Sequence, residues 1–285
     1  MTPTLVRQHL PSTGEISRRD LGARARDWSE IQERMLVPLY EAVYERLEVG
    51  SATRVLGLGC GSGLALLMAA SRGAAVAGVE PACPERLALA RQRLLPETWG
   101  TRARVGTRLV EGAPGDAADA DAPPYTLVTA FEPIGCLAGD SEGLGELLAS
   151  ATPLAERGAP VALAGWGPPE RCATSSVLRV ATKLADPLRS TGSWRPALRD
   201  DLEEVAQRAG LKPDGSGRVA CPFGYADLDS ALKGLLSTGL FDAAIEATDQ
   251  AQVDKEVTEA LHPYQRRDGT VWMPNVFRYL IARVP

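Results

Sequence analysis

Short apolar runs and amphipathic stretches alternate along most of the chain. The apolar runs have the length of buried strands, and the stretches between them carry apolar residues at helical spacing. Seven strands are expected, over residues 54–59, 74–81, 108–113, 125–133, 159–166, 217–223 and 277–284. Helices are expected over residues 63–73, 83–95, 141–158 and 198–211. This alternation implies parallel crossovers, and so an α/β fold with a doubly wound sheet covered by helices on both faces.

The N-terminal region and two later segments, residues 167–197 and 225–268, lie outside this alternation. Residues 24–49 have apolar side chains at helical spacing, and Pro38 is expected to divide them into two helices because its ring interrupts a helix interior. The segment 225–268 separates the last two strands and has a mostly helical pattern. We expect residues 1–50 to form an N-terminal arm, over residues 1–20, followed by lid helices. Residues 51–285 are expected to form one α/β domain, with insertions at about 167–197 and 225–268.

Composition narrows the class of protein and its partners. Apolar residues make up 45% of the chain and charged residues 24%, as in globular domains, and the net charge of −5 favours neither nucleic acid nor an acidic membrane as a partner. The five cysteines are scattered and there are only two histidines, so no metal site is expected. The chain shows no signal peptide or membrane-spanning pattern, and we expect a cytoplasmic protein.

The first predicted strand runs into a glycine-rich stretch, "VLGLGCGSG", over Val55–Gly63. Glycines between a strand and a helix let the backbone approach a ligand closely, and the helix N-terminus adds oriented N–H groups. A phosphate-binding loop would need a Lys that is absent here, and a dinucleotide fingerprint fails because Ser62 and Leu64 stand where its last glycine would be. The pattern that remains is G-x-G-x-G at Gly59, Gly61 and Gly63.

With this motif the chain resembles the class I S-adenosylmethionine-dependent methyltransferases. The glycine-rich stretch matches the family's first motif except at Gly57, where the family usually carries an acidic residue near the amino-acid part of the cofactor. A second match is Glu80, which ends the next strand in "VAGVEP". The resemblance covers about residues 28–211. Small-molecule methyltransferases of actinobacteria are similar to this chain in two stretches, "DWSEIQERMLVPLYEAV" and "AGWGPPERC".

The resemblance implies a Rossmann-like, seven-stranded sheet whose last strand is antiparallel. It also implies S-adenosyl-L-methionine as cofactor, with S-adenosyl-L-homocysteine as product. Glu80 would accept hydrogen bonds from both ribose hydroxyls. The family's acidic residue at the adenine amino group is replaced by Ala113, with Asp116 nearby as a substitute. The cofactor-binding residues implied are Gly57, Gly59, Cys60, Gly61, Gly63, Glu80, Pro81, Ala113, Pro114 and Phe131.

Two residues follow the fourth and fifth strands, where ligands bind in open α/β sheets. Glu132 is a candidate catalytic base, although it could instead orient the substrate, contact the cofactor or cap the next turn. Trp166 is a candidate aromatic wall of the substrate site or a cation–π neighbour of the sulfonium, with core packing as the alternative. His262 is a second candidate base, because it is the only histidine outside the N-terminal arm.

Three further residues are candidates for binding the substrate. Trp28 and Tyr40 lie in the N-terminal helices, which the resemblance implies close over the substrate, and plain packing is the alternative for both. Arg171 is a candidate anchor for a substrate carboxylate. Residues 225–268 are expected either to cap the pocket or to pair two subunits in a homodimer.

The expected function is methyl transfer to an O, N or C atom of a small organic molecule, in the biosynthesis of natural products. In-line transfer depends mainly on alignment and on exclusion of water. Because Gly57 and Ala113 lack the family's acidic groups, one alternative is a protein of this fold that binds the cofactor structurally and catalyses a non-methylating step such as cyclisation. A nicotinamide oxidoreductase, which would need the longer glycine fingerprint, and a non-catalytic binding protein are two further possibilities.

Overall fold

The structure is a computed structural model that describes residues 20–95, 106–118, 122–135, 140–185 and 201–285. Apart from Asp20, the arm predicted for residues 1–20 lies outside these ranges. The end of the insertion predicted for residues 167–197 lies outside them as well.

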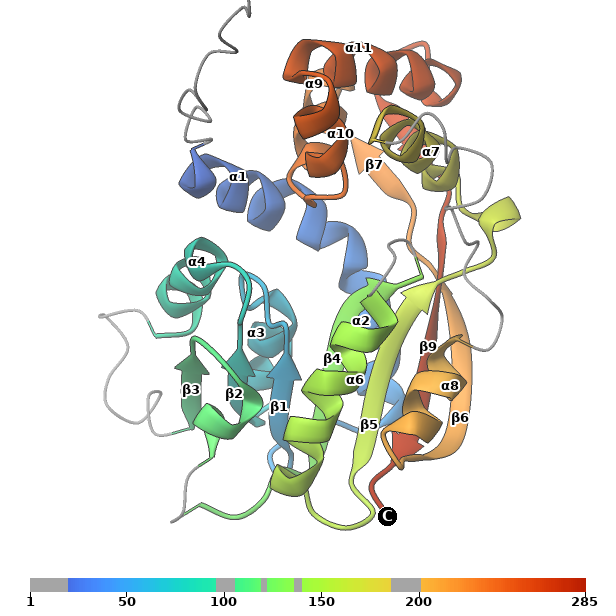
Figure 1. The fold of residues 1–285 in the computed structure, drawn as a ribbon. Helices are drawn as coiled ribbons and strands as arrows, with labels where there is room; N and C mark the ends of the chain where they lie inside the picture. The colour runs from blue at the N-terminus through green and yellow to red at the C-terminus, as the bar shows by residue number, and fades with distance from the viewer. Residues whose placement is uncertain (1–19, 96–105, 119–121, 136–139, 186–200) are drawn as a thin grey trace, which may run out of the picture.

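A seven-stranded sheet forms the centre of the molecule (Figure 1). In spatial order its strands are β3 (Thr107–Val110), β2 (Ala75–Val79), β1 (Arg54–Leu58), β4 (Leu127–Ile134), β5 (Pro160–Trp166), β9 (Val276–Arg283) and β6 (Lys212–Ala220). The first five are parallel, and β9 pairs antiparallel with both β5 and β6. The predicted α/β fold, the seven strands and the antiparallel last strand are confirmed.

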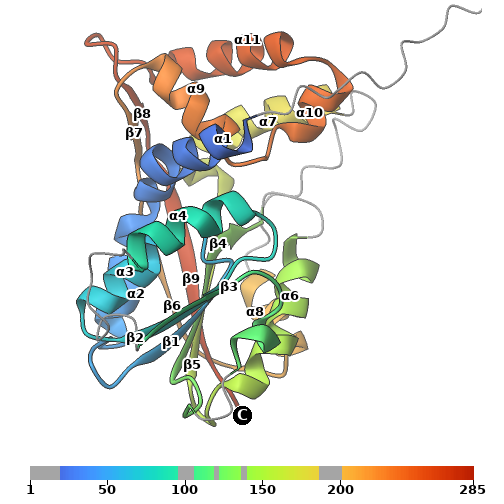
Figure 2. The ribbon, with the colours of Figure 1, turned by 90° about the vertical axis from the view of Figure 1, so that its left-hand side faces the viewer.

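Helices cover both faces of this sheet, because its central strands carry apolar side chains on both sides. Val55 belongs to one core cluster, and its neighbour Leu56 belongs to the other. Figure 2 shows one layer of helices on each side of the sheet. One layer contains α2 (Val37–Arg46), α3 (Leu64–Ser71) and α4 (Pro84–Leu94), and the other contains α6 (Asp140–Ala151) and α8 (Asp201–Arg208).

The N-terminal segment is helical but not uniform. It begins with α1 (Leu21–Asp27), whose N-cap Asp20 accepts a hydrogen bond from the backbone of Ala23. A π-helical turn over Trp28–Gln32 and a 3₁₀ turn over Glu33–Leu36 follow before α2 begins. Pro38 lies in the first turn of α2, where it needs no hydrogen-bond partner, so the helical segment changes geometry ahead of the proline and not at it.

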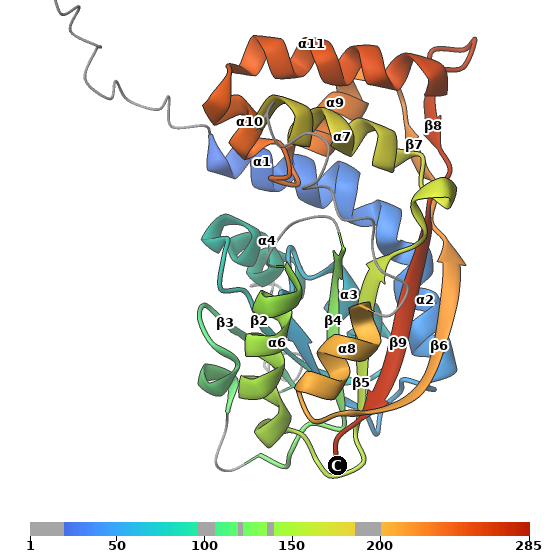
Figure 3. The same ribbon diagram turned by 45° about the vertical axis from the view of Figure 1, so that its right-hand side comes forward.

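A helical cap lies beyond the carboxyl ends of the parallel strands (Figures 1 and 3). It contains α7 (Thr174–Ala185), α9 (Leu228–Leu236), α10 (Asp242–Ala247), α11 (Gln250–Leu261) and a small antiparallel sheet of β7 (Phe223–Tyr225) and β8 (Val271–Met273). The patterns did not predict this small sheet, because its strands have three residues each. α9 contacts the π-helical turn, so the cap and the N-terminal segment meet above the sheet. Within the described ranges, no helix is both long and apolar enough to cross a membrane.

Candidate functional site

The glycine-rich turn joins β1 to α3 and has a backbone that only glycine adopts readily. Gly59, Gly61 and Gly63 all have positive φ angles, of +61°, +55° and +80°. Gly63 is also crowded, since a β-carbon there would lie 3.0 Å from the Cβ of Ala90 in α4. The turn therefore keeps its shape through glycine, and its backbone is open to a close approach at the carboxyl end of β1.

Glu80 follows β2 and lies beside this turn with only 4% of its surface exposed. Its Oε2 accepts a hydrogen bond from the backbone N–H of Gly61 at 2.9 Å. Its Oε1 accepts one from the backbone N–H of Ala82 at 3.2 Å. Each carboxylate oxygen retains a second acceptor site. Glu80 is thus a fixed acceptor at the edge of the glycine turn, where the sequence predicts a ribose-binding group.

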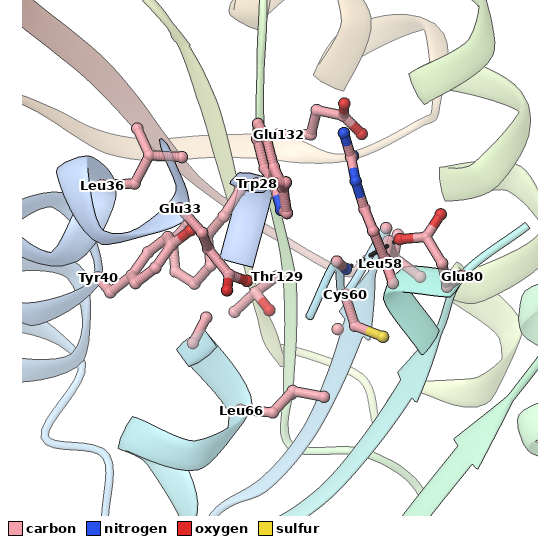
Figure 4. A pocket seen from close by; sticks show the side chains of 16 residues that line it. Trp28, Glu33, Leu36, Tyr40, Leu58, Cys60, Leu66, Glu80, Thr129 and Glu132 are labelled. Atoms are coloured by element: carbon pink, nitrogen blue, oxygen red, sulfur yellow. Dashed lines mark hydrogen bonds between the residues drawn. The ribbon is translucent and has the colours of Figure 1, made fainter. Parts of the chain in front are cut away.

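A cleft with an empty volume of about 470 Å³ opens over the turn (Figure 4). Glu33 and Tyr40 reach in from the N-terminal helices, and Cys60 and Glu80 lie on the opposite side. The described residues that line it are Trp28, Glu33, Leu36, Tyr40, Gly57, Leu58, Gly59, Cys60, Gly61, Ala65, Leu66, Glu80, Arg86, Thr129, Phe131 and Glu132. The cleft thus brings together most of the cofactor-binding residues expected from the sequence.

The aromatic residues of the cleft pack in ways that fix their rings. Tyr40 packs against Phe131 with ring centroids 4.9 Å apart, and burial raises the pKa of Tyr40 well above its ordinary value. The guanidinium of Arg86 lies 4.0 Å from the ring centroid of Trp28. Burial also raises the pKa of Cys60 to about 12, so its thiol is protonated at neutral pH and is not a nucleophile.

A buried polar network ties the N-terminal segment to the glycine turn. Glu33 is only 2% exposed, and it accepts hydrogen bonds from the hydroxyl of Ser62 and, at 3.0 Å, from Arg93. Arg93 also donates to Ser29 at 2.7 Å. Because a buried carboxylate needs such partners, this network stabilises the N-terminal segment over the turn.

An apolar chamber adjoins the cleft on the side of the cap, with an empty volume of about 1030 Å³. Trp166 packs against Phe277 at 4.6 Å and against Phe223 at 6.0 Å between ring centroids. Among the described lining residues, Glu132 is the one charged side chain. The residues that line both the cleft and the chamber are Trp28, Leu36, Leu58, Gly59 and Glu132. A ligand in the cleft and a second one in the chamber would therefore meet at Trp28 and Glu132.

Four of the residues expected to bind cofactor do not line the cleft. Gly63 caps α3 behind the turn, and Pro81 is exposed beyond Glu80. Ala113 and Pro114 begin a 3₁₀ turn after β3 and are not among the residues that line the cleft. Asp116, the expected substitute at the adenine, accepts a hydrogen bond from the backbone of Ala113 at 2.9 Å, so its carboxylate closes this local turn.

The structure separates the other candidate residues. Trp166 lies in the apolar chamber, as expected for an aromatic wall, and Trp28 and Tyr40 line the cleft. Arg171 lines a different pocket, which Trp166 also borders, together with Arg218 and Arg278. His262 is exposed at the end of α11 and lines neither cavity. The prediction of His262 as a base does not fit this arrangement, because α11 carries it to the outside of the cap.

Several residues of the site carried no signal in the sequence. Glu33 and Gln32 belong to the irregular turn after α1, and Phe223 and Phe277 belong to the last strands. A helical pattern does not predict that Trp28 and Glu33 share a face, since they are five residues apart. Within the described ranges, no cluster of three or more His, Cys, Asp or Glu side chains could hold a metal ion.

Sequence comparisons find no matching family model and no matching curated protein. Comparison of structures finds a candidate methyltransferase of Bacillus halodurans, with a TM-score of 0.52, 13% identity, and coverage of 86% of this chain and 98% of that one. YjhP of Escherichia coli has a TM-score of 0.51 and 19% identity over 92% of this chain and 99% of its own. The [4+2]-cyclase SpnF has a TM-score of 0.50 and 12% identity, and the match covers 87% of this chain and 80% of SpnF. The likeness establishes the architecture: this chain has the Rossmann-like fold of the class I methyltransferases.

Proposed function

We propose that this protein transfers a methyl group from S-adenosylmethionine to an O, N or C atom of a small apolar molecule. The observation that carries the proposal is the shared wall between the cleft and the chamber. The cleft holds the glycine turn and Glu80, and the chamber is lined mostly by apolar and aromatic groups. Trp28 and Glu132 stand where the two cavities meet.

The residues of the cleft fit the proposed cofactor. The glycine turn borders the cleft with backbone that carries no β-carbons at Gly59 and Gly61, and Glu80 offers acceptors for two ribose hydroxyls. Cys60, Phe131 and Leu66 supply apolar contacts around them. When bound, the cofactor would supply an electrophilic methyl group on a sulfonium.

The chain's own residues would align the substrate and exclude water from it. The rings of Trp166, Phe223 and Phe277 hold an apolar body without offering it a hydrogen bond. Such alignment of the reacting atoms accounts for much of the rate of a displacement. Where the substrate's nucleophile carries a proton, Glu132 would accept it, because its carboxylate is at the junction of the two cavities.

A second candidate function keeps the cofactor but not the transfer. The likeness to the [4+2]-cyclase SpnF supports a non-methylating reaction, such as a cyclisation, in the same chamber. The two functions differ in the mass of the product, because a cyclised product has the mass of its substrate and a methylated one gains a methylene.

The first test is calorimetric titration of the full chain with S-adenosylhomocysteine, with NADH as the control ligand. We expect micromolar binding of S-adenosylhomocysteine alone. Absence of binding would refute the proposal. Incubation with methyl-labelled S-adenosylmethionine and a panel of apolar ring compounds then separates the two functions: labelled product supports methyl transfer, and unlabelled product of unchanged mass supports the cyclase.

A further inference from the structure

The first strand lacks the acidic residue that the resemblance leads one to expect at Gly57, so another group must meet the amino-acid end of a cofactor in this cleft. A side chain at Gly57 would also be crowded, since a β-carbon there would lie 3.0 Å from a terminal methyl of Leu66. A carboxylate from outside the sheet reaches the space above Gly61 instead. It belongs to Glu33, in the turn that follows α1.

Two polar groups of the N-terminal segment point to the same spot above Gly61. A β-carbon on Gly61 would lie 3.2 Å from Oε1 of Glu33 and 3.3 Å from Nε1 of Trp28. One of these atoms is an acceptor, and the other is a donor. Both side chains line the cleft, and both approach Gly61 closely because this residue has no side chain.

The donor has no partner of its own. Trp28 is 9% exposed, and its buried Nε1–H makes no hydrogen bond to any described residue. Buried indole N–H groups are ordinarily paired, so an unpaired one facing a cleft indicates a ligand acceptor. Arg86 stacks on the ring of Trp28 and holds the indole in this position.

The acceptor is only partly used. Oε2 of Glu33 takes the hydrogen bonds from Ser62 and Arg93. Oε1 accepts one long hydrogen bond, from the backbone N–H of Leu64 at 3.3 Å. The oxygen that faces the spot above Gly61 thus has a free acceptor position.

We propose that Trp28 and Glu33 hold the amino-acid end of the cofactor, in place of the acidic residue missing at Gly57. Nε1–H of Trp28 donates to the carboxylate of the ligand, and Oε1 of Glu33 accepts from its ammonium group. Such a zwitterion has no net charge, which suits a site where Arg93 already balances Glu33. This inference rests on the proposed function, because it assumes that S-adenosylmethionine binds in the cleft.

The test compares two ligands that differ only at the amino-acid end. S-adenosylhomocysteine carries that end, and methylthioadenosine has the same adenosyl thioether without it. Calorimetry of Trp28→Phe should show affinity for S-adenosylhomocysteine reduced on the order of tenfold, as for a lost hydrogen bond to a charged group, with affinity for methylthioadenosine unchanged. Phenylalanine keeps a ring for Arg86 to stack on.

Glu33→Gln is the second variant and should give the same selective loss. Its matched control is Glu203→Gln. Glu203 is also paired with an arginine, Arg278, and neither residue lines the cleft. Trp272→Phe is the control for the tryptophan, because Trp272 is 41% exposed on β8. Neither control should alter the binding of either ligand.

The outcomes separate this inference from the proposed function. If the unmodified protein binds S-adenosylhomocysteine and Trp28→Phe binds it equally well, the inference is wrong and the cofactor proposal stands. Equal weakening of both ligands in Trp28→Phe would also overturn the inference, since a general distortion of the cleft explains it. If the unmodified protein binds neither ligand, both the proposed function and the inference fail.

Discussion

Glu80→Gln tests the assignment of the cleft most directly. In the structure each oxygen of the Glu80 carboxylate accepts one backbone N–H, from Gly61 at 2.9 Å and from Ala82 at 3.2 Å. A glutamine of nearly the same shape has one acceptor oxygen and one NH₂ group, which only donates. One of the two backbone N–H groups must therefore lose its partner, and the negative charge disappears.

The two effects have different magnitudes and are measured separately. Loss of one hydrogen bond to the charged carboxylate should lower the free energy of unfolding by about 1–3 kcal/mol. Replacing a charged acceptor with a neutral one should weaken each ribose hydrogen bond by about 1 kcal/mol, so two bonds correspond to about a thirtyfold loss of affinity. Urea denaturation without ligand measures the first effect, and calorimetric titration with S-adenosylhomocysteine measures the second.

Glu85→Gln is the matched control, because Glu85 lies in the first turn of α4 and does not line the cleft. It should leave the affinity unchanged. An affinity of Glu80→Gln within twofold of the unmodified protein would remove Glu80 from the cofactor site. A loss of affinity without any loss of stability would contradict the hydrogen bonds to the two backbone N–H groups.

The same geometry leads to three further predictions. Glu132→Gln should lower kcat, measured as release of S-adenosylhomocysteine, with little change in cofactor affinity, because an amide cannot accept a proton. Gly63→Ala should reduce the free energy of unfolding, measured in urea, by about 2–5 kcal/mol, because the new side chain strains a left-handed backbone and clashes with α4. Gly145→Ala in α6 should instead stabilise the fold by about 0.5–1 kcal/mol, because nothing lies within 4 Å of the new β-carbon. Burial raises the pKa of the Cys60 and Cys221 thiols from 9.0 to about 12. Between these values only the unfolded chain ionises, so the free energy of unfolding should fall as the pH rises above 9, by about 1.4 kcal/mol per thiol at pH 10.

Each of these predictions has a result that contradicts it. A normal turnover of Glu132→Gln would show that the carboxylate is not a base. Equal stability of the two alanine variants would mean that the glycine turn tolerates a side chain. For the thiols, the double variant with alanine at Cys60 and Cys221 should lose part of the fall in stability between pH 8 and pH 10, because burial also raises the pKa of Cys172, Tyr40, Tyr44 and Tyr225. An unchanged fall would assign it to these other groups.

The regular part of the fold was predictable because its signals are local. Most strands are apolar runs and the helices are amphipathic stretches, and parallel crossovers follow from their alternation. The strand predicted at residues 217–223 is the exception, because β6 begins earlier, at Lys212, in a polar and mostly exposed stretch. The glycine turn and Glu80 were predictable too, since each directly follows a strand. Residues at the carboxyl ends of neighbouring parallel strands lie at the same edge of the sheet, so their proximity needs no side-chain detail.

The remaining parts of the site depend on contacts between distant segments. Trp166 and Arg171 are close in sequence and share one pocket, yet only Trp166 also reaches the apolar chamber, because the chain turns away from the chamber after β5. His262 has the right chemistry for a base, but α11 carries it to the outside of the cap. Phe223 and Phe277 line the chamber only because β7 and β9 converge there from separate stretches of chain.

For this protein the sequence by itself determined the order of strands and helices, the glycine turn and the acceptor at Glu80, because spacing along the chain encodes them. Only the tertiary structure decided what faces that turn. Trp28 and Glu33 are five residues apart, and a regular α-helix would direct them to different faces. The π-helical turn between them, closed by a hydrogen bond from the backbone N–H of Glu33 to the carbonyl of Trp28, brings both over Gly61. That geometry comes from packing against the turn and the cap, and no local pattern of residues specifies it.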